Sequence, residues 1–380
     1  MHVLMLCKRQ YTGRDLIDDR YGRLWEIPEA LARRGHAVSG IALSYRYRDS
    51  GNFLSEAGVR WRSINALSLE TMQLKRAIKR LHQQRPVDVL LTSSDAPCTV
   101  LGASLAKHIH TPHAADLYDN YESFGLSRIP GLRAAFRRAC AGSTAISAVT
   151  HALADQVKST LSTPVPVHVI GNGVRRDLFH PIDRRTSREM LGLPVKARLI
   201  GCAGALDQSR GIEDLFRAFH ALSERHPDIH LVIAGPRDAT LQRYPHPRII
   251  DFGVIGWKQV PLLINSLDVS VVCNRNSAFG RFCYPLKLAE SIACGTPIVA
   301  TDVGDTRRIG GDAIRAYTPG NIDELVEAID LQLRMPLSNT NLRALDWEER
   351  AIQMEALLVE ATRPKSPLNS GSRPRDRTVV

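Results

Sequence analysis

The stretch FCYPLKLAESIACGTPIVATDVG (282–304) contains the repeating unit from which the fold can be predicted. Its first half has a helical pattern that opens at Pro285 and stops at Gly295. Its second half, TPIVATD (296–302), is an apolar run rich in β-branched residues. A helix followed directly by a buried strand is the unit of an α/β protein with a parallel sheet.

The same alternation of strands and helices continues on both sides of this stretch. It restarts at VHVIGNGV (167–174), so we expect an α/β fold with two mostly parallel sheets, each covered by helices on both faces. Apolar runs suited to buried strands occur at 2–7, 36–43, 87–91 and 144–149 before the restart, and at 197–204, 230–236 and 269–273 after it.

The restart divides the chain into predicted domains. We place a first domain at 1–168, a second at 169–345 and a last helix at 346–361. Residues 362–380 are rich in Pro, Ser and Arg and are predicted to form a disordered basic tail.

Length and composition favour a cytoplasmic protein. The 380 residues are enough for two domains, and no apolar run reaches the length of a signal peptide core or a membrane span. The seven cysteines lack CxxC or zinc-like spacing, and several lie in apolar runs, which is typical of buried thiols in a reducing compartment.

The start of the helix within 282–304 carries the chemistry of an anion site. Proline suits the first turn of a helix, and the amide groups of Leu286 and Lys287 would lie at the positive end of the helix dipole. Lys287 would add a full charge. Glu290, one turn further along, is badly placed for a phosphate but suits hydroxyl donors such as those of a ribose, and an unpaired carboxylate among apolar neighbours would be costly.

A second strand end supplies matching groups. The segment GCAGALDQSRG (201–211) leaves its predicted strand through Gly204 and presents Arg210 just before a helix. Ligands of parallel α/β sheets bind at the carboxyl ends of strands, and an arginine fork fits phosphate oxygens. Together with Pro285, Leu286, Lys287 and Glu290, these residues predict a site for a nucleoside diphosphate, although Arg210 and Lys287 could also be ordinary surface cations.

Several motifs in order resemble one family. The chain is similar to the retaining glycosyltransferases called group 1 or family 4, which have the GT-B fold of two Rossmann-like domains facing a central cleft. The motifs that carry the resemblance are VIGNGVRRDLFHP (169–181), GALDQSRGIEDLFRAF (204–219), LVIAGP (231–236), DFGVIGWKQVPLLINSLDVSVV (251–272), FGRFCYPLKLAESIACGTPIVATDVG (279–304) and DWEERAIQMEALLVEA (346–361).

The resemblance implies a function and a division of labour. It implies that the second domain binds a nucleotide-diphosphate sugar through Glu290, Arg210 and Lys287, and that the first domain binds a glycan or lipid-linked acceptor. The helix at 346–361 would cross back to the first domain. No Asp-x-Asp motif is present, so no metal and no other cofactor is expected.

Several positions depart from the family pattern. The family has two glutamates separated by seven residues; Glu290 matches the second, but Phe282 occupies the position of the first, which contacts the donor sugar. Ala205 occupies the position of a family arginine. The loop after the first strand has the isolated Gly13 where the family has a glycine pair near the diphosphate.

An acidic cluster follows another predicted strand of the first domain. In DLYDNYESFG (116–125), Asp119 is a candidate to orient the acceptor, and Asp116 and Glu122 are candidate acceptor contacts. The same carboxylates could instead cap a turn, and the sequence does not separate these two interpretations.

Three classes of function remain open from the sequence. The first is a sugar transferase in surface polysaccharide or glycolipid synthesis. The second is a GT-B relative that isomerises a nucleotide sugar or glucosylates a nucleobase, and the third is a non-catalytic nucleotide-sugar-binding protein, suggested by Phe282. Binding of nucleic acid is not expected, because the basic residues are not interleaved with aromatic ones.

Positive charge is concentrated in the first half of the chain. Residues 1–170 carry a net charge of +8, and residues 171–361 carry −1. The segment IPGLRAAFRRACAG (129–142) combines Phe136 with three arginines, and we expect it to lie against an anionic membrane at the inner face of the cell membrane. For LKRAIKRLHQQR (74–85) an ordinary surface helix is an equal alternative.

Overall fold

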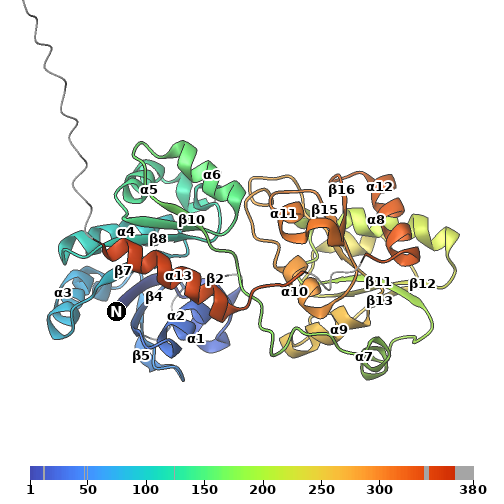
Figure 1. Ribbon diagram of the computed structural model, residues 1–380, viewed down its shortest axis with the longest axis horizontal. Coiled ribbons are helices and arrows are strands. Elements are labelled where there is room, and N and C mark those ends of the chain that lie inside the picture. Colours follow the sequence, from blue (N-terminus) through green and yellow to red (C-terminus); the bar gives the residue numbers. More distant parts are fainter. Residues whose placement is uncertain (12, 47, 49, 124, 338–341, 364–380) are drawn as a thin grey trace, which may run out of the picture.

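The computed structural model describes residues 1–11, 13–46, 48, 50–123, 125–337 and 342–363 (Figure 1). From residue 364 on, the predicted tail lies outside the described residues. Two α/β domains lie side by side, each built around its own sheet. This confirms the predicted α/β class with two mostly parallel sheets.

The first sheet has eight strands in the order β10-β9-β8-β7-β1-β4-β6-β5 among the described residues. All neighbours pair in parallel except β5 and β6, which are antiparallel. The bounds are β1 (His2–Lys8), β4 (Ala37–Ser44), β5 (Gly51–Leu54), β6 (Arg60–Asn65), β7 (Val89–Ser93), β8 (His113–Leu117), β9 (Ala145–Ala148) and β10 (Val167–Val169).

The second sheet is parallel throughout its described strands. Their order is β13-β12-β11-β14-β15-β16, and the interior strands are buried on both faces, which explains their continuous apolar sequences. The bounds are β11 (Arg198–Ala203), β12 (Ile229–Ala234), β13 (Ile249–Asp251), β14 (Val269–Val272), β15 (Ile298–Thr301) and β16 (Ile314–Tyr317).

Helices cover both faces of each sheet. In the first domain they are α1 (Leu16–Asp19), α2 (Arg23–Arg33), α3 (Leu69–Gln84), α4 (Ala96–His108), α5 (Leu132–Ala141) and α6 (His151–Thr160). In the second domain they are α7 (Arg184–Leu191), α8 (Ile212–Arg225), α9 (Val260–Ser266), α10 (Leu286–Cys294), α11 (Thr306–Gly310) and α12 (Ile322–Arg334). A short hairpin, β2 (Gln10–Tyr11) and β3 (Arg14–Asp15), follows β1.

The last helix, α13 (Trp347–Thr362), lies on the first domain, where Figure 1 shows it in red across the blue elements. Its Met354 and Leu357 are buried in the same cluster as Leu24 of α2 and Met5 of β1. Asp346 caps its start, accepting a hydrogen bond from the amide of the residue three positions on. The chain therefore begins and ends its described part in one domain.

A buried ion pair joins three parts of the first domain. Arg23, at the start of α2, donates to both carboxylate oxygens of Asp116 in β8, and the closest approach is 2.7 Å. Arg23 also donates to the carbonyl of Gly171 in the segment that leaves for the second domain, at 2.8 Å. Burial alone would raise the pKa of Asp116, but Arg23 and the hydroxyls of Ser147 and Ser93 hold it below its ordinary value.

This arrangement predicts a large stability loss when only one partner is removed. Asp116→Asn would leave the Arg23 charge buried and uncompensated, so the free energy of unfolding should fall by about 3–5 kcal/mol, measured by urea denaturation. Arg33→Gln is a control on the same helix, because Arg33 forms an exposed ion pair with Glu348. Arg33→Gln should lower the free energy of unfolding by no more than about 1 kcal/mol. Equal losses for Asp116→Asn and Arg33→Gln would contradict the buried ion pair.

Candidate functional site

The carboxyl ends of the two sheets meet at the junction of the domains. The side-chain amide of Asn120, after β8, donates to the carbonyl of Ala278, after β14, at 3.4 Å. The hydroxyl of Thr150, after β9, donates to the carbonyl of Phe282 at 3.0 Å. Loops that follow strands therefore face one another across the junction, which is where parallel sheets place their ligands.

Lys287 lies in the first turn of α10 and reaches the loop that follows β11. Its Nζ donates to the carbonyl of Ala205 at 2.9 Å. Gly204 makes this approach possible, because a Cβ on Gly204 would stand 2.6 Å from Cε of Lys287, and its φ of +109° disfavours other residues. The lysine is thus held beside the strand end predicted to face a diphosphate.

Glu290 follows one turn later and has no hydrogen-bond or ion-pair partner among the residues the structure describes. Burial raises its pKa to about 7, and the charge of Lys287 opposes that rise. Tyr21 of the first domain lies near enough for the Glu290 carboxylate to add to the rise that burial causes in the tyrosine pKa, to about 12. A partly buried carboxylate without a protein donor is suited to hydroxyl groups of a ligand.

Arg210 ends a 3₁₀ turn, η3 (Gln208–Arg210), at the other end of the β11 loop. Its guanidinium stacks on the ring of Phe279 with 4.1 Å to the centroid, and it has no ion-pair partner in the described part of the chain. Asp119 lies across the junction. Burial raises the pKa of Asp119 to about 6, while the Asn120 amide and the positive charges of Arg210 and Lys8 oppose the rise.

The start of α10 differs from the expectation that Pro285 would occupy its first turn. Pro285 is the N-cap, with φ −77° and ψ 79°, and the helix begins at Leu286. The amide of Leu286 donates to the carbonyl of Tyr284 at 2.9 Å, because the non-helical Pro285 turns the chain back on itself. The prediction that the Leu286 amide is free was therefore wrong. Of the two amides, that of Lys287 has no hydrogen-bond partner among the described residues.

Gly13 lies in the turn of the β2–β3 hairpin with φ +77°. No described atom lies within 4 Å of the position a Cβ would take, so the backbone conformation and not crowding favours glycine. Its neighbour Arg14 stacks on Tyr21 at 4.6 Å. The hairpin is thereby linked to Tyr21, whose pKa responds to the charge of Glu290.

Phe282 contributes to the core of the first domain although it belongs to the second. It is 7% exposed and lies in a cluster with Tyr121, Phe136 and Leu117. The position where the family has its first glutamate is therefore an apolar contact between domains. Recognition of a donor sugar by a carboxylate at this position is absent here.

The other acidic residues of 116–125 are engaged within the first domain. Asp116 is 2% exposed, and its two carboxylate oxygens accept hydrogen bonds from Arg23, Ser93 and Ser147. Glu122 forms a bidentate pair with Arg137, with distances of 2.6 and 3.0 Å. Asp116 and Glu122 therefore have their carboxylates engaged by side chains of the first domain. Of the three carboxylates, the structure brings only Asp119 to the junction near Arg210.

A pocket that the sequence patterns did not reveal lies at the carboxyl ends of strands of the first sheet. Its volume is about 210 Å³. Lys8 ends β1, Arg46 follows β4 and Asp95 follows β7, so residues far apart in sequence meet there. The sequence contains one signal that could have identified Lys8, because this cation directly follows an apolar run. The lining residues are Lys8, Gln10, Tyr45, Arg46, Asp95, Ala96, Pro97, Tyr121, Leu126 and Ser127.

The segment 129–142, predicted to contact a membrane, contains the helix α5, but its apolar side chain Phe136 faces inward. Phe136 is 6% exposed and packs edge-to-face against Tyr121, so its ring is not available to enter a membrane, as the predicted membrane contact through 129–142 would need. The period of α5 directs Phe136 inward together with Ala139 and Cys140. Within the described residues, no helix combines the length and the apolar character needed to cross a membrane.

Comparison with known families identifies the class of the protein. A family model for group 1 glycosyl transferases matches residues 197–334, and a model for glycosyltransferase family 4 matches residues 23–178. The two matches cover the second sheet, the first sheet except β1, and the loops that meet at the junction. The chain belongs to the group 1 glycosyltransferases, which have the GT-B fold.

Two curated relatives are similar over part of their length. A protein named as a teichuronic acid biosynthesis glycosyltransferase of Bacillus subtilis strain 168 is 26% identical over 242 residues, covering 63% of this chain and 58% of the relative. A D-inositol 3-phosphate glycosyltransferase of Xylanimonas cellulosilytica is 28% identical over 224 residues, covering 52% of each. The chain thus spans about half the length of these curated relatives.

Solved structures show the same fold at low sequence identity. A sucrose-phosphate synthase from Thermosynechococcus elongatus has a TM-score of 0.76 at 19% identity, covering 95% of this chain and 99% of its own. Anabaena HepE in complex with UDP-glucose has a TM-score of 0.64 at 16% identity, covering 95% and 97%. The predicted GT-B fold is confirmed.

The pKa of Glu290 predicts how its replacement changes stability with pH. The folded state holds the proton up to about pH 7, whereas the ordinary value is 4.5, so wild-type stability falls as pH rises through this interval. Glu290→Gln avoids that loss. Its free energy of unfolding, measured in urea, should exceed that of wild type by about 3 kcal/mol above pH 7 and should not differ from it below pH 4.5.

Glu327→Gln is the matched control for this measurement, because Glu327 is exposed on α12 of the same domain. The difference in free energy of unfolding between this variant and wild type should stay the same as pH rises. If the difference in free energy of unfolding between Glu290→Gln and wild type stays constant from pH 4.5 to about 7, the assigned pKa is contradicted.

Proposed function

We propose that this protein transfers a glycosyl group from a nucleotide-diphosphate sugar to a hydroxyl of a glycan or lipid-linked acceptor, with retention of the anomeric configuration. The observation that carries the proposal is the group of side chains around the β11 loop and α10. It joins two cations, Lys287 and Arg210, to Glu290, a carboxylate that has no protein partner among the described residues. The product would be part of a surface polysaccharide or glycolipid.

In this proposal each of the three residues has a separate task on the donor. Glu290 accepts hydrogen bonds from the ribose hydroxyls. Lys287 and Arg210 neutralise the diphosphate, with help from the Lys287 amide and the positive end of α10. The solved complex of the similar Anabaena HepE contains UDP-glucose, which supports a nucleotide sugar as donor.

The chemical step then needs no strong protein base. The bond between the anomeric carbon and the diphosphate oxygen breaks as the acceptor oxygen bonds to the same face of that carbon. The leaving phosphate accepts the proton of the acceptor hydroxyl. Charge on the diphosphate grows during this step, so fixed cations stabilise the transition state more than the ground state. Asp119, near Arg210, orients the acceptor hydroxyl.

The acceptor would enter from the first domain, through the pocket of about 210 Å³. Lys8 and Arg46 line this pocket and have no ion-pair partner in the described part of the chain. These two cations outnumber the one carboxylate among the lining residues, that of Asp95, which favours an acceptor that carries a phosphate or carboxylate. Leu126, 44% exposed, gives the pocket an apolar rim.

One observation favours a second candidate function. Phe282 places an apolar side chain where the family has the glutamate that contacts the donor sugar, which suits a protein that binds nucleotide sugars without transferring them. Turnover of donor to free nucleotide, measured with and without acceptors, separates the two functions. Catalysis of either transfer or hydrolysis excludes a purely binding role.

We also propose that the reaction proceeds without a metal ion and in the cytoplasm, with no nucleic acid as partner. The cations named above supply the charge that a divalent metal supplies in other transferases. All seven cysteines are free, as expected for a reducing compartment.

The role of Glu290 can be tested by donor binding. A thermal-shift screen with UDP- and GDP-sugars should identify a stabilising donor, since a ligand at a hundred times its Kd adds about 2.7 kcal/mol. Glu290→Gln should then weaken binding of that donor by about 1.5–3 kcal/mol, the worth of a charge-assisted hydrogen bond. Glu327→Gln should bind normally, and an unchanged Kd for Glu290→Gln would rule out the ribose contact.

The role of the two cations can be tested by kinetics. Arg210→Ala and Lys287→Ala should each lower kcat by about 10²–10³ while changing the donor KM much less, because they act on charge that develops in the transition state. Arg217→Ala, an exposed arginine of α8, is the control. Activity should survive EDTA, and loss on chelation with recovery in magnesium or manganese would overturn the metal-free step.

A further inference from the structure

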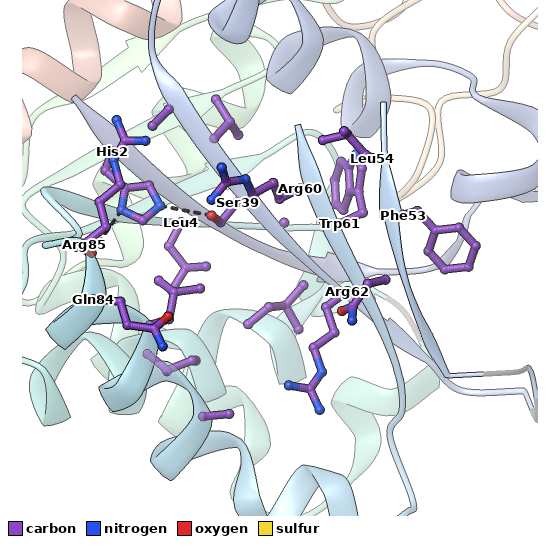
Figure 2. A pocket seen from close by; sticks show the side chains of 18 of the residues that line it. His2, Leu4, Ser39, Phe53, Leu54, Arg60, Trp61, Arg62, Gln84 and Arg85 are labelled. Carbon is purple, nitrogen blue, oxygen red and sulfur yellow. Dashed lines mark hydrogen bonds between the residues drawn. The ribbon is translucent and has the colours of Figure 1, made fainter. Parts of the chain in front are cut away.

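A groove on the first domain, distant from the junction, is not used by the proposed reaction. Its volume is about 770 Å³, and it lies between α3 and the β5–β6 edge of the sheet (Figure 2). His2 marks one end, where its ring bonds to the hydroxyl of Ser39 at 3.0 Å and to the carbonyl of Arg85. His2 begins β1 and Lys8 ends it, so this end is about 20 Å from the junction.

The groove is open because the sheet extends beyond the helix that covers it. Leu74 and Ile78 of α3 pack onto Leu4 and Ile41, which lie on the middle strands β1 and β4. The antiparallel strand β5 widens the sheet on that side without a helix above it. A partly apolar floor therefore faces solvent between α3 and β6.

Positive charge surrounds this floor without compensation. Arg60 and Arg62 lie on the same face of β6, and Figure 2 shows Arg62 extending from that strand into the groove. Arg80 of α3 and Arg85, which directly follows that helix, line the opposite side. All four are exposed and have no ion-pair partner among the described residues, and no Asp or Glu lines the groove.

Apolar side chains stand beside these cations. Leu54 of β5 lines the groove and is 72% exposed. On α3, Leu69, Met72, Arg76 and Lys79 recur at intervals of three or four residues, so they form one exposed stripe next to Arg80. Leu69 and Met72 are 76% and 80% exposed. A surface that combines unpaired cations with exposed large apolar residues is typical of membrane contact.

We propose that this face, formed by the groove and the outer stripe of α3, docks on membranes that contain anionic phospholipids. A phosphodiester headgroup enters the groove between Arg60, Arg62 and Arg85, while Leu69 and Met72 enter the interface. The proposal does not depend on the proposed function, because neither the groove nor the stripe includes a donor or acceptor residue. It locates the membrane contact on α3 in place of α5.

Other occupants fit the face less well. The tail at 362–380 carries five Lys and Arg against one Asp, so it would be repelled, and a second copy of the basic face would be repelled in the same way. Single-stranded nucleic acid binds by stacking successive bases on exposed rings. Of the two aromatic rings that line the groove, Trp61 is 1% exposed and Phe53 is 38% exposed, so the groove offers one ring and not a series of them. A soluble phosphate would leave the apolar stripe uncovered.

Vesicle binding by the full chain tests the proposal. Wild type should sediment with vesicles of phosphatidylcholine and phosphatidylglycerol, in a salt-sensitive manner, and not with phosphatidylcholine alone. A variant with Arg60, Arg62 and Arg85 replaced by Gln should bind roughly a hundredfold more weakly, from about 1 kcal/mol per basic side chain. Leu69→Gln with Met72→Gln should weaken binding at low and high salt alike.

The control variant removes three unpaired arginines around α5, by Arg128→Gln, Arg133→Gln and Arg138→Gln. It should retain most of the binding. Equal losses in the two triple variants, a larger loss in the α5 variant, or no binding by wild type would each overturn the proposal. Displacement from vesicles by soluble glycerol phosphate would instead assign the groove to a free phosphate ester.

Two further measurements keep the outcome clear. The thermal unfolding midpoint of the groove variant should match that of wild type, since the three arginines are exposed and unpaired in the described structure. Its binding of the donor nucleotide should also be unchanged. A failure of membrane binding with intact donor binding would therefore leave the proposed transferase function standing.

Discussion

The contact between Arg23 and Asp116 is the constraint on which the arrangement of the first domain depends. It joins the start of α2, the carboxyl end of β8 and, through the carbonyl of Gly171, the segment that leads to the second domain. Both charges are almost completely buried, so neither can exchange its partner for water without a large cost. The exit of the chain toward the donor domain is consequently fixed by a charge pair at the end of a strand.

The segment fixed in this way also positions the last helix. Arg350 of α13 donates to the carbonyl of Asn172 at 3.1 Å and lies against the ring of Tyr284, just before α10. The crossover segment, the returning helix and the start of the donor-side helix therefore meet at one place. This links the packing of the first domain to the chemistry of the second.

Phe282 shows how a domain contact and a binding position can compete for one residue. Its side chain packs with Tyr121 and Phe136 in the first domain, and its carbonyl accepts a hydrogen bond from Thr150. Asp305 strengthens the same junction by accepting hydrogen bonds from the backbone amides at the start of α6. Burial of an aromatic ring and a helix cap both favour contact of the domains. The apolar contact stands where a carboxylate would otherwise contact sugar hydroxyls.

The sequence alone determined the features that depend on local pattern. Continuous apolar runs identified interior strands such as β1 and β14, and Gly295 ended α10 where expected, because strand burial and left-handed caps have short-range signatures. The short edge strand β5 was missed, since its residues are mostly exposed and carry no apolar alternation. The membership of the family likewise followed from motifs in order, without knowledge of distances.

Tertiary structure decided which polar groups were already satisfied. Asp116 pairs with an arginine 93 positions away, and Phe136 packs against Tyr121 of another element. The helical period of α5 turns Phe136 inward, but the residues that it meets there are not visible in that spacing. Glu290 has no partner in the described structure only because no donor from another strand or helix reaches it. Burial, charge pairing and the open groove beside α3 all depend on long-range contacts, and a sequence pattern records only the residues available to make them.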